Sequence, residues 1–196
     1  MKLIPEQIDY YLKQGELKDA RAEKLLDEYK MDVLSEGYKA SDVEYGAAPL
    51  AATSNTYQQY LNEKASSDEF RNCLESVELP TPNREDNIAE VGSFVAYVDM
   101  PSYVNGTGKK VSMDPKYLEV LLIEGSIGRN VDMDVKCVSV SSPLGLAIEG
   151  HSEEEEVTFT TYSKQYGKIT HNCAIQSINN EYIYDRYSSE YSRQMR

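Results

Sequence analysis

The chain of 196 residues has no tryptophan, three phenylalanines and three cysteines. Cys73, Cys137 and Cys173 form no C-x-x-C pair, which argues against a disulfide framework and against a four-ligand zinc site. So few thiols predict a reducing, cytoplasmic compartment. The sequence also lacks an N-terminal apolar segment and any apolar run of about 18 residues, so we expect neither a secretory signal nor a membrane span.

The sequence also has fewer basic than acidic residues. The net charge is −13, and acidic side chains outnumber basic ones in both halves of the sequence. Duplex DNA is bound through lysine and arginine contacts to phosphate, so we expect no independent DNA binding. An acidic protein is better suited to a basic surface on a protein partner.

Motifs of nucleophilic or nucleotide chemistry are absent too: there is no G-x-S-x-G, P-loop or dinucleotide fingerprint. His171 and Cys173 share a face if they lie on a strand, and with Cys137 they could meet a metal ion. Buried thiols and one hydrogen-bonded histidine are the favoured alternative. His151 follows Gly150 and is interpreted as a partner for the end of a helix.

Residues 4–36 have the apolar spacing of one long helix with a coiled-coil seam, broken at Asp19. The seam positions are Ile8, Leu12, Gly15, Asp19, Ala22, Leu26, Tyr29 and Val33. A second, less regular helical pattern runs over residues 56–77. Two such helices predict an antiparallel hairpin.

After the hairpin, Pro80-Thr81-Pro82-Asn83 indicates a linker. We expect strands over residues 91–98, 116–125, 135–140, 157–162 and 172–178, with a buried helix turn as the alternative for 116–125. Asn105 to Lys110 has the composition of a hairpin turn. The predicted fold class is α+β, with a helical hairpin over 1–79, a linker over 80–90, a β-domain over 91–178 and a peripheral tail over 179–196.

Residues 137–150 are predicted to form a strand that leads directly into a short helix; their sequence is C-V-S-V-S-S-P-L-G-L-A-I-E-G. Ser142 is a candidate N-cap, and Pro143 fits the first helical turn. Leu144, Ala147 and Ile148 define one apolar face, and Gly150 is suited to the helix end.

The same stretch resembles the C-terminal signature of bacterial GreA/GreB transcript-cleavage factors. The resemblance is carried by Ser139, Ser142-Pro143-Leu144-Gly145, Ala147-Ile148 and Gly150, and then by the acidic run Glu153–Glu156 and Val157-Thr158-Phe159. We interpret the acidic run as a solvated turn. Glu149 departs from it, because the family usually has an apolar residue there. The resemblance implies an FKBP-like twisted sheet with a short helix, and docking to RNA polymerase through Ser139, Ser142, Pro143, Leu144, Gly145 and Gly150.

Residues 37–48, G-Y-K-A-S-D-V-E-Y-G-A-A, resemble the tip of the family's coiled coil through Gly37, Glu44, Tyr45, Ala47 and Ala48. In the family, two tip acids help to hold a catalytic magnesium in the polymerase. Tyr38 and Ser41 stand at those positions here and cannot supply the carboxylates that magnesium prefers. Asp42 and Glu44 are the remaining carboxylates for that shared ion. The alternative for Asp42 is an N-cap of the second helix.

The resemblance therefore implies a protein that binds RNA polymerase at its secondary channel and contacts nascent RNA only within that complex. It would modulate elongation and would not itself be an enzyme. Because Tyr38 and Ser41 replace the acids, we expect weak stimulation of transcript cleavage. An FKBP-type prolyl isomerase and a coiled-coil adaptor without polymerase binding are the alternatives.

Overall fold

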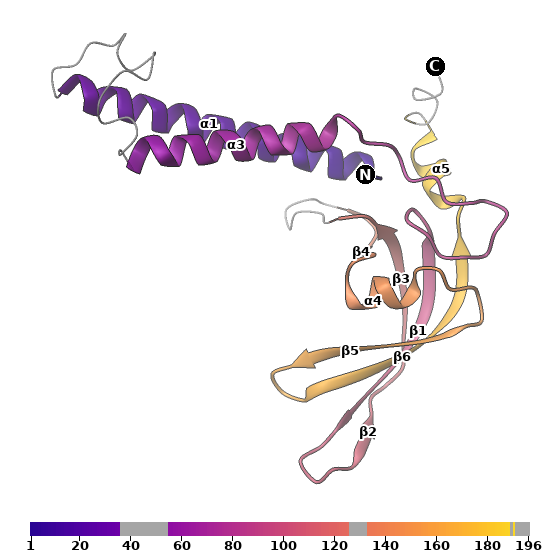
Figure 1. The fold of residues 1–196 in the computed structure, drawn as a ribbon. Helices are drawn as coiled ribbons and strands as arrows, with labels where there is room; N and C mark the ends of the chain where they lie inside the picture. Colours follow the sequence, from indigo (N-terminus) through magenta and orange to yellow (C-terminus); the bar gives the residue numbers. More distant parts are fainter. Residues whose placement is uncertain (36–54, 126–132, 189, 191–196) are drawn as a thin grey trace. The chain divides into compact units, whose positions relative to one another are not determined.

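The computed structural model describes residues 1–35, 55–125, 133–188 and 190. The chain divides into two compact units (Figure 1). The helical hairpin is Ile8–Val77, and the sheet domain combines Met1–Gln7 with Glu78–Arg196. The α+β fold class predicted from the sequence is confirmed. Within the described residues, no helix combines the length and the apolar character that a membrane span needs.

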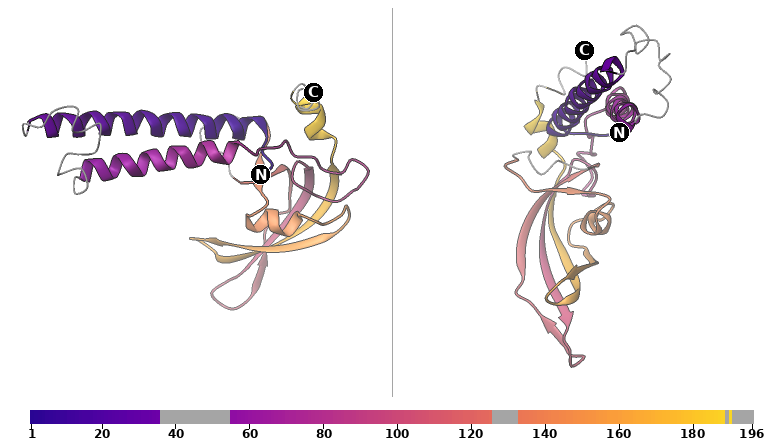
Figure 2. Two further views of the ribbon diagram at one scale, coloured as in Figure 1. Left: turned by 45° about the horizontal axis from the view of Figure 1, so that its top comes forward. Right: turned by 90° about the vertical axis from the view of Figure 1, so that its left-hand side faces the viewer.

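The hairpin pairs α1 (Pro5–Ser35) with α3 (Asn55–Leu74), and the two helices run side by side in both views of Figure 2. Contacts between them progress in opposite directions along the two helices, from Tyr11 on Phe70 to Tyr29 on Tyr57. The helices are therefore antiparallel, as predicted.

The predicted seam is correct in part. Ala22 and Tyr29 are buried, whereas the Leu12 side chain is 49% exposed, so its place in the seam was wrong. Asp19 does not break the packing, because its carboxylate accepts hydrogen bonds from Lys64 and Arg71 of α3. A polar crosslink occupies the seam where the sequence pattern indicated an interruption.

The sheet domain contains one sheet with strand order β4-β3-β1-β6-β5, and β2 pairs with β1 beyond this path. The strands are β1 (Phe94–Val104), β2 (Lys110–Ser112), β3 (Lys116–Ile123), β4 (Cys137–Ser139), β5 (Glu156–Ser163) and β6 (Gly167–Asn179). Only the β3–β4 pair is parallel among the pairings of the described strands. The strand alternative for residues 116–125 is confirmed, and the helix alternative is wrong.

Apolar side chains cover both faces of the sheet. One face packs against the short helix α4 (Pro143–Ile148), with Val95, Tyr97 and Ile175 at the centre of the contact. On the other face, Leu121 and Ile123 pack against Ile4 from the start of the chain. The second view in Figure 2 shows α4 on one side of the curved sheet.

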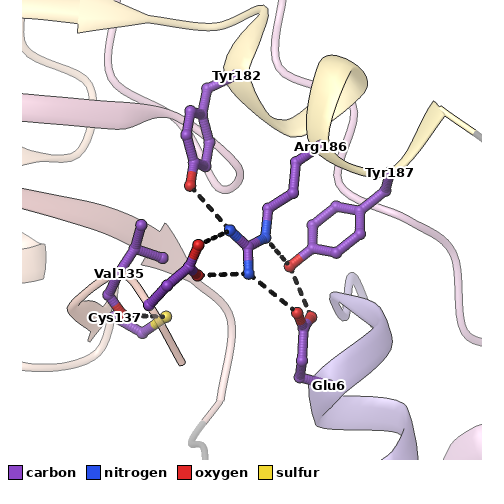
Figure 3. Close-up of polar contacts among 7 residues, drawn as sticks. Glu6, Val135, Cys137, Tyr182, Arg186 and Tyr187 are labelled. Atoms are coloured by element: carbon purple, nitrogen blue, oxygen red, sulfur yellow. Dashed lines mark hydrogen bonds and ion pairs between the residues drawn. The ribbon is translucent and has the colours of Figure 1, made fainter. Parts of the chain in front are cut away.

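The predicted tail differs from the structure. Residues Tyr182–Arg186 form helix α5, and Ile183 is fully buried in the second core with Tyr187. The Arg186 guanidinium donates to Tyr182 Oη at 3.2 Å and to Glu6 Oε1 at 3.3 Å, and its ion pair with Asp134 is 2.6 Å long (Figure 3). These contacts tie α5 to the first turn of α1 and to the segment before β4.

The segment predicted as a linker is packed against the sheet domain. The buried Asn180 side-chain amide donates to the carbonyl oxygens of Asn83 at 2.8 Å and of Asp86 at 2.6 Å. Tyr184 Oη donates to the Pro82 carbonyl at 3.0 Å. Residues 80–90 are thus held by side chains from the far end of the chain, which no local pattern in the sequence indicates.

Candidate functional site

The stretch 137–150 folds as the sequence predicts. β4 pairs in parallel with the end of β3, and the Val140 N–H donates to the Ile123 carbonyl at 2.9 Å. The chain then turns back over the sheet into α4, with its start fixed by the Ser142 N–H, which donates to the Ser139 carbonyl at 2.9 Å. The strand and the helix therefore form one unit built on the sheet edge.

Ser142 is the N-cap of α4, as predicted. Its backbone is extended, with φ −78° and ψ 159°, and its hydroxyl accepts the Gly145 N–H at 3.1 Å. Pro143 follows in the first turn, where a helix has no partner for an N–H. Both residues start a six-residue helix, which by itself is too short to be stable.

Gly145 is required by close approach of two backbone segments. A Cβ atom at this position would lie 2.0 Å from the Ser139 carbonyl oxygen and 2.7 Å from the Val140 Cα. Only a residue without a side chain allows α4 to lie this close to the end of β4. Gly145 was predicted as a docking residue, but it is buried. It therefore serves the packing of α4 and is not available for a surface contact.

The end of α4 is fixed by Gly150, whose φ is +79°. Its N–H donates to the Ala89 carbonyl at 2.8 Å, and the Ala89 N–H donates to the His151 carbonyl at 2.9 Å. His151 Nδ1 lies 3.3 Å from the Glu149 carbonyl, which agrees with its predicted place at a helix end. The helix is thus held at both ends.

The two sides of α4 have different surroundings. Ile148 is fully buried, and Leu144 and Ala147 pack against the first core. On the opposite side, Leu146 is 65% exposed and follows the exposed Pro143 at a spacing of three residues. Leu146 was not among the predicted docking residues, although its position opposite the apolar face indicates an exposed side chain.

The six predicted docking residues therefore have separate places. Pro143 and Gly150 are exposed, Ser139, Ser142 and Leu144 are half-buried, and Gly145 is buried. Ser139 Oγ lies 2.8 Å from Ser141 Oγ and accepts the Ser141 N–H. We define the α4 surface as Ser141, Pro143, Leu146, Glu149 and Gly150, the exposed residues of this stretch.

The acidic run after the helix is more than a solvated turn. Glu153 Oε1 accepts the Ile178 N–H at 2.8 Å, so this carboxylate closes the end of β6. Glu154 adopts φ +67°, and its N–H donates to the Ile175 carbonyl at 3.0 Å. The run fixes the entry into β5: Glu155 Oε2 also accepts the Ser152 N–H at 3.2 Å, and Glu154 and Glu156 are exposed.

His171, Cys173 and Cys137, which could have met a metal ion, do not converge. His171 and Cys173 share one face, and both contact Asp99: His171 Nδ1 lies 2.9 Å from Asp99 Oδ2, and Cys173 Sγ lies 3.6 Å from Oδ1. Cys137 packs with the second core on the other face. No group of three metal-binding side chains occurs among the residues whose positions are given. The favoured alternative, a hydrogen-bonded histidine and a buried thiol, therefore holds for His171 and Cys173, whereas Cys137 is half-buried.

Both ring nitrogens of His171 and one face of its ring have contacts. Its Nε2 lies 2.8 Å from Thr161 Oγ1, and its ring stacks on Phe159 at 4.4 Å with an interplanar angle of 5°. Burial, with the nearby charge of Asp99, raises the pKa of the Cys173 thiol to about 12 and raises the pKa of Tyr97 as well. Tyr97 is 2% exposed, so it belongs to the core and does not line an open aromatic basin of the kind a prolyl isomerase needs.

The second predicted site, the hairpin tip, lies outside the described residues. Tyr38, Ser41, Asp42, Glu44 and Tyr45 all fall within residues 36–54. Their roles stay predictions from the sequence.

No protein-family model matches the chain, and no curated protein does either. Solved structures are similar to it at low sequence identity. Two of them are Gfh1, described as a transcription factor, and the GreA factor homolog Gfh1 of Thermus thermophilus. Each is 16% identical over 91% of this chain, with a TM-score of 0.30, and 96% and 98% of their own lengths are covered.

A third is the transcription elongation factor GreA/GreB from Nitrosomonas europaea, 16% identical over 58% of this chain and 79% of its own, with a TM-score of 0.28. The matched structures are of the family that the sequence motifs resemble.

Proposed function

We propose that the protein is a Gre-like transcription factor that binds RNA polymerase through the α4 surface. The observation that carries the proposal is the stretch 137–150. Its Gre-like residues form a capped strand-to-helix unit, and the unit presents Leu146 to solvent. A solvent-exposed leucine beside a proline, on a backbone fixed at both ends, is suited to a protein contact that needs little ordering on binding.

The helical hairpin supports the proposal. Its two helices are tied by aromatic contacts and by the Asp19 crosslink, so they form a stable pair. In the proposed complex, the hairpin enters the secondary channel with residues 37–48 at its tip. The net charge of −13 complements a basic surface on the polymerase.

Binding is tested by pull-down of purified core RNA polymerase with the full chain. We expect capture of the polymerase by the wild type and at least a tenfold loss of affinity for Leu146→Glu, because a carboxylate would be desolvated at the contact. Tyr117→Glu is the matched control, since Tyr117 is 61% exposed on the same domain and Leu146 is 65% exposed. Failure of the wild type to bind would favour the adaptor alternative, and equal loss for both variants would exclude the α4 surface.

The reaction at the tip would be carried out by the polymerase, so we propose a factor and not an enzyme. Asp42 and Glu44 are the carboxylates proposed to approach the magnesium ion of the polymerase, and Tyr38 and Ser41 limit the stimulation of cleavage. A cleavage assay on stalled complexes tests this part. Weak cleavage is expected. Robust cleavage that is lost in Asp42→Ala or Glu44→Ala would show a full carboxylate role instead.

A further inference from the structure

Lysines gather at one end of the sheet in this acidic protein. Residues 100–113 and 157–180 contain Lys109, Lys110, Lys164 and Lys168 and no carboxylate, although the whole chain has 33 Asp and Glu. The first range forms most of the β1–β2 hairpin and the second the β5–β6 hairpin, and β1 and β6 pair as far as Tyr103 and Ile169. Charge counts by half of the sequence do not reveal this concentration.

The two hairpins enclose adjoining hollows on the sheet. One has a volume of about 480 Å³ and is lined by Tyr103, Lys110, Tyr166, Lys168 and Thr170, among others. The second, of about 310 Å³, shares Ser102 and Lys110 with the first. We call the two together the distal groove. The first hollow alone is within the size range of sites for small ligands.

Strand register places the polar lining of the groove on one face. Ser102 lies opposite Thr170 of β6 and Ser112 of β2, and Asn172 lies two residues further along β6. The residues that line the groove thus include Ser102, Ser112, Thr170 and Asn172, together with Lys110 and Lys168. The core against α4 occupies the opposite face.

Tyrosine rings border the groove. Tyr103 and Tyr166 form a pair with ring centroids 4.8 Å apart, tilted by 41°. Tyr162 lies opposite Lys168 in the β5–β6 ladder and is 83% exposed. A large aromatic ring at this exposure contributes little to folding, and its free face is available for stacking.

We propose that the distal groove binds single-stranded nucleic acid. The lysines would contact phosphate, the tyrosines would stack on bases, and the hydroxyl and amide groups would hydrogen-bond base edges or sugars. A duplex fits poorly, because it needs more cationic contacts than this surface offers. The proposal adds a second contact to the proposed polymerase factor and does not depend on it, since the α4 surface and the distal groove share no residues.

The test is fluorescence anisotropy of a labelled oligouridine of about ten nucleotides, with oligodeoxythymidine as the second probe, titrated with the full chain at low salt. Binding of either probe is expected. The affinity should fall as the salt concentration rises. The double variant Lys110→Ala/Lys168→Ala should weaken binding at least tenfold. It should also reduce the slope of log K against log salt by about 1.4, because each of the two lost phosphate contacts contributes about 0.7. Tyr162→Ala should weaken binding with the salt slope unchanged.

Lys24→Ala/Lys136→Ala is the matched control, since it removes the same charge from exposed lysines elsewhere. It should bind as the wild type does, and so should Leu146→Glu. All the altered side chains are exposed, so circular dichroism should confirm that the variants are folded. The proposal is overturned if neither probe binds, if the control loses as much affinity as the groove variant, or if poly-glutamate competes as well as the unlabelled oligonucleotide.

Discussion

A methyl group on residue 145 would overlap the carbonyl oxygen of Ser139. At the scale of single residues, most of what defines the α4 unit is of this kind: one hydroxyl at Ser142, one missing side chain at Gly145 and one left-handed backbone at Gly150. The residue types were recognisable in the sequence. The reason for Gly145 was not, because the atoms it would meet belong to the strand before the helix.

Gly145→Ala should therefore lower the free energy of unfolding of the sheet domain by about 3 kcal/mol, since backbone atoms must shift to relieve the overlap. Gly150→Ala should cost about 1 kcal/mol, because its φ is left-handed but the space around it is open. Urea unfolding measures both. Gly106→Ala is the control and should change nothing, as no atom lies near its Cβ position. Equal costs at residues 145 and 150 would contradict the steric argument.

The thiols provide a second prediction at this scale. Burial raises the pKa of Cys137 to about 11 and that of Cys173 to about 12. In a Cys73→Ala background, at about pH 8, only roughly 0.1% of the Cys137 thiol is ionised. Labelling by a disulfide reagent should be at least about 100-fold slower than in denaturant, and it should accelerate about tenfold per pH unit. A rate independent of pH would contradict this prediction.

At the scale of elements, helix and strand positions followed from apolar spacing, and a short helix was predicted between Ser142 and Gly150, where Pro143–Ile148 is helical. Side-chain placement within the elements was less predictable. Leu12 fits the heptad count but is exposed, whereas Tyr11 packs on Phe70. Asp19 is polar but lies in the seam, because α3 supplies Lys64 and Arg71 opposite it. Such partners depend on the register between helices, which a single sequence pattern does not contain.

The Asp19 crosslink should make the hairpin sensitive to acid. The pKa of Asp19 lies below 3.8, chiefly because its carboxylate accepts a hydrogen bond from Ser67. The hydrogen bond from Lys64 and the positive charge of Arg71 lower this pKa further. A lowered folded pKa means that the stabilisation is present above about pH 3.8 and is lost as the pH falls through the folded pKa.

Asp19→Asn should consequently lower the urea midpoint of the helical signal at about pH 6, and the difference from wild type should shrink at about pH 2.5. Asp27→Asn, at an exposed position of the same helix, is the control and should have little effect at either pH. A midpoint difference that is the same at both pH values would mean that Asp19 contributes by packing alone.

At the scale of the whole molecule, the sheet domain is completed by both ends of the described chain. Ile4 from the first residues and Ile183 and Tyr187 from α5 share one core with Leu121 and Ile123. The sequence predicted the order of hairpin, connection and sheet. It did not predict this closure, because the segments involved are short and their partners lie at least 60 residues away in the sequence.

Truncation after Asn180 should therefore lower the thermal midpoint of the sheet domain sharply, because it uncovers Leu121 and Ile123. Ile183→Ala should cost about 3 kcal/mol of unfolding free energy through the cavity that it leaves. Truncation after Glu190 keeps α5 and is the control. Calorimetry measures all three, and a truncation after Asn180 with an unchanged midpoint would show that α5 is dispensable.

The burial of Leu3, Ile4 and Gln7 in the sheet domain has a consequence during protein synthesis. Ile4 is made about 180 residues before its partners Ile183 and Tyr187 in α5, which at 5–20 residues per second is a delay of roughly 10–40 s. The intervening hairpin has mainly local contacts and can fold during that interval. Nascent chains should thus carry a folded hairpin while Ile4 is not yet covered by α5 and is available to a chaperone.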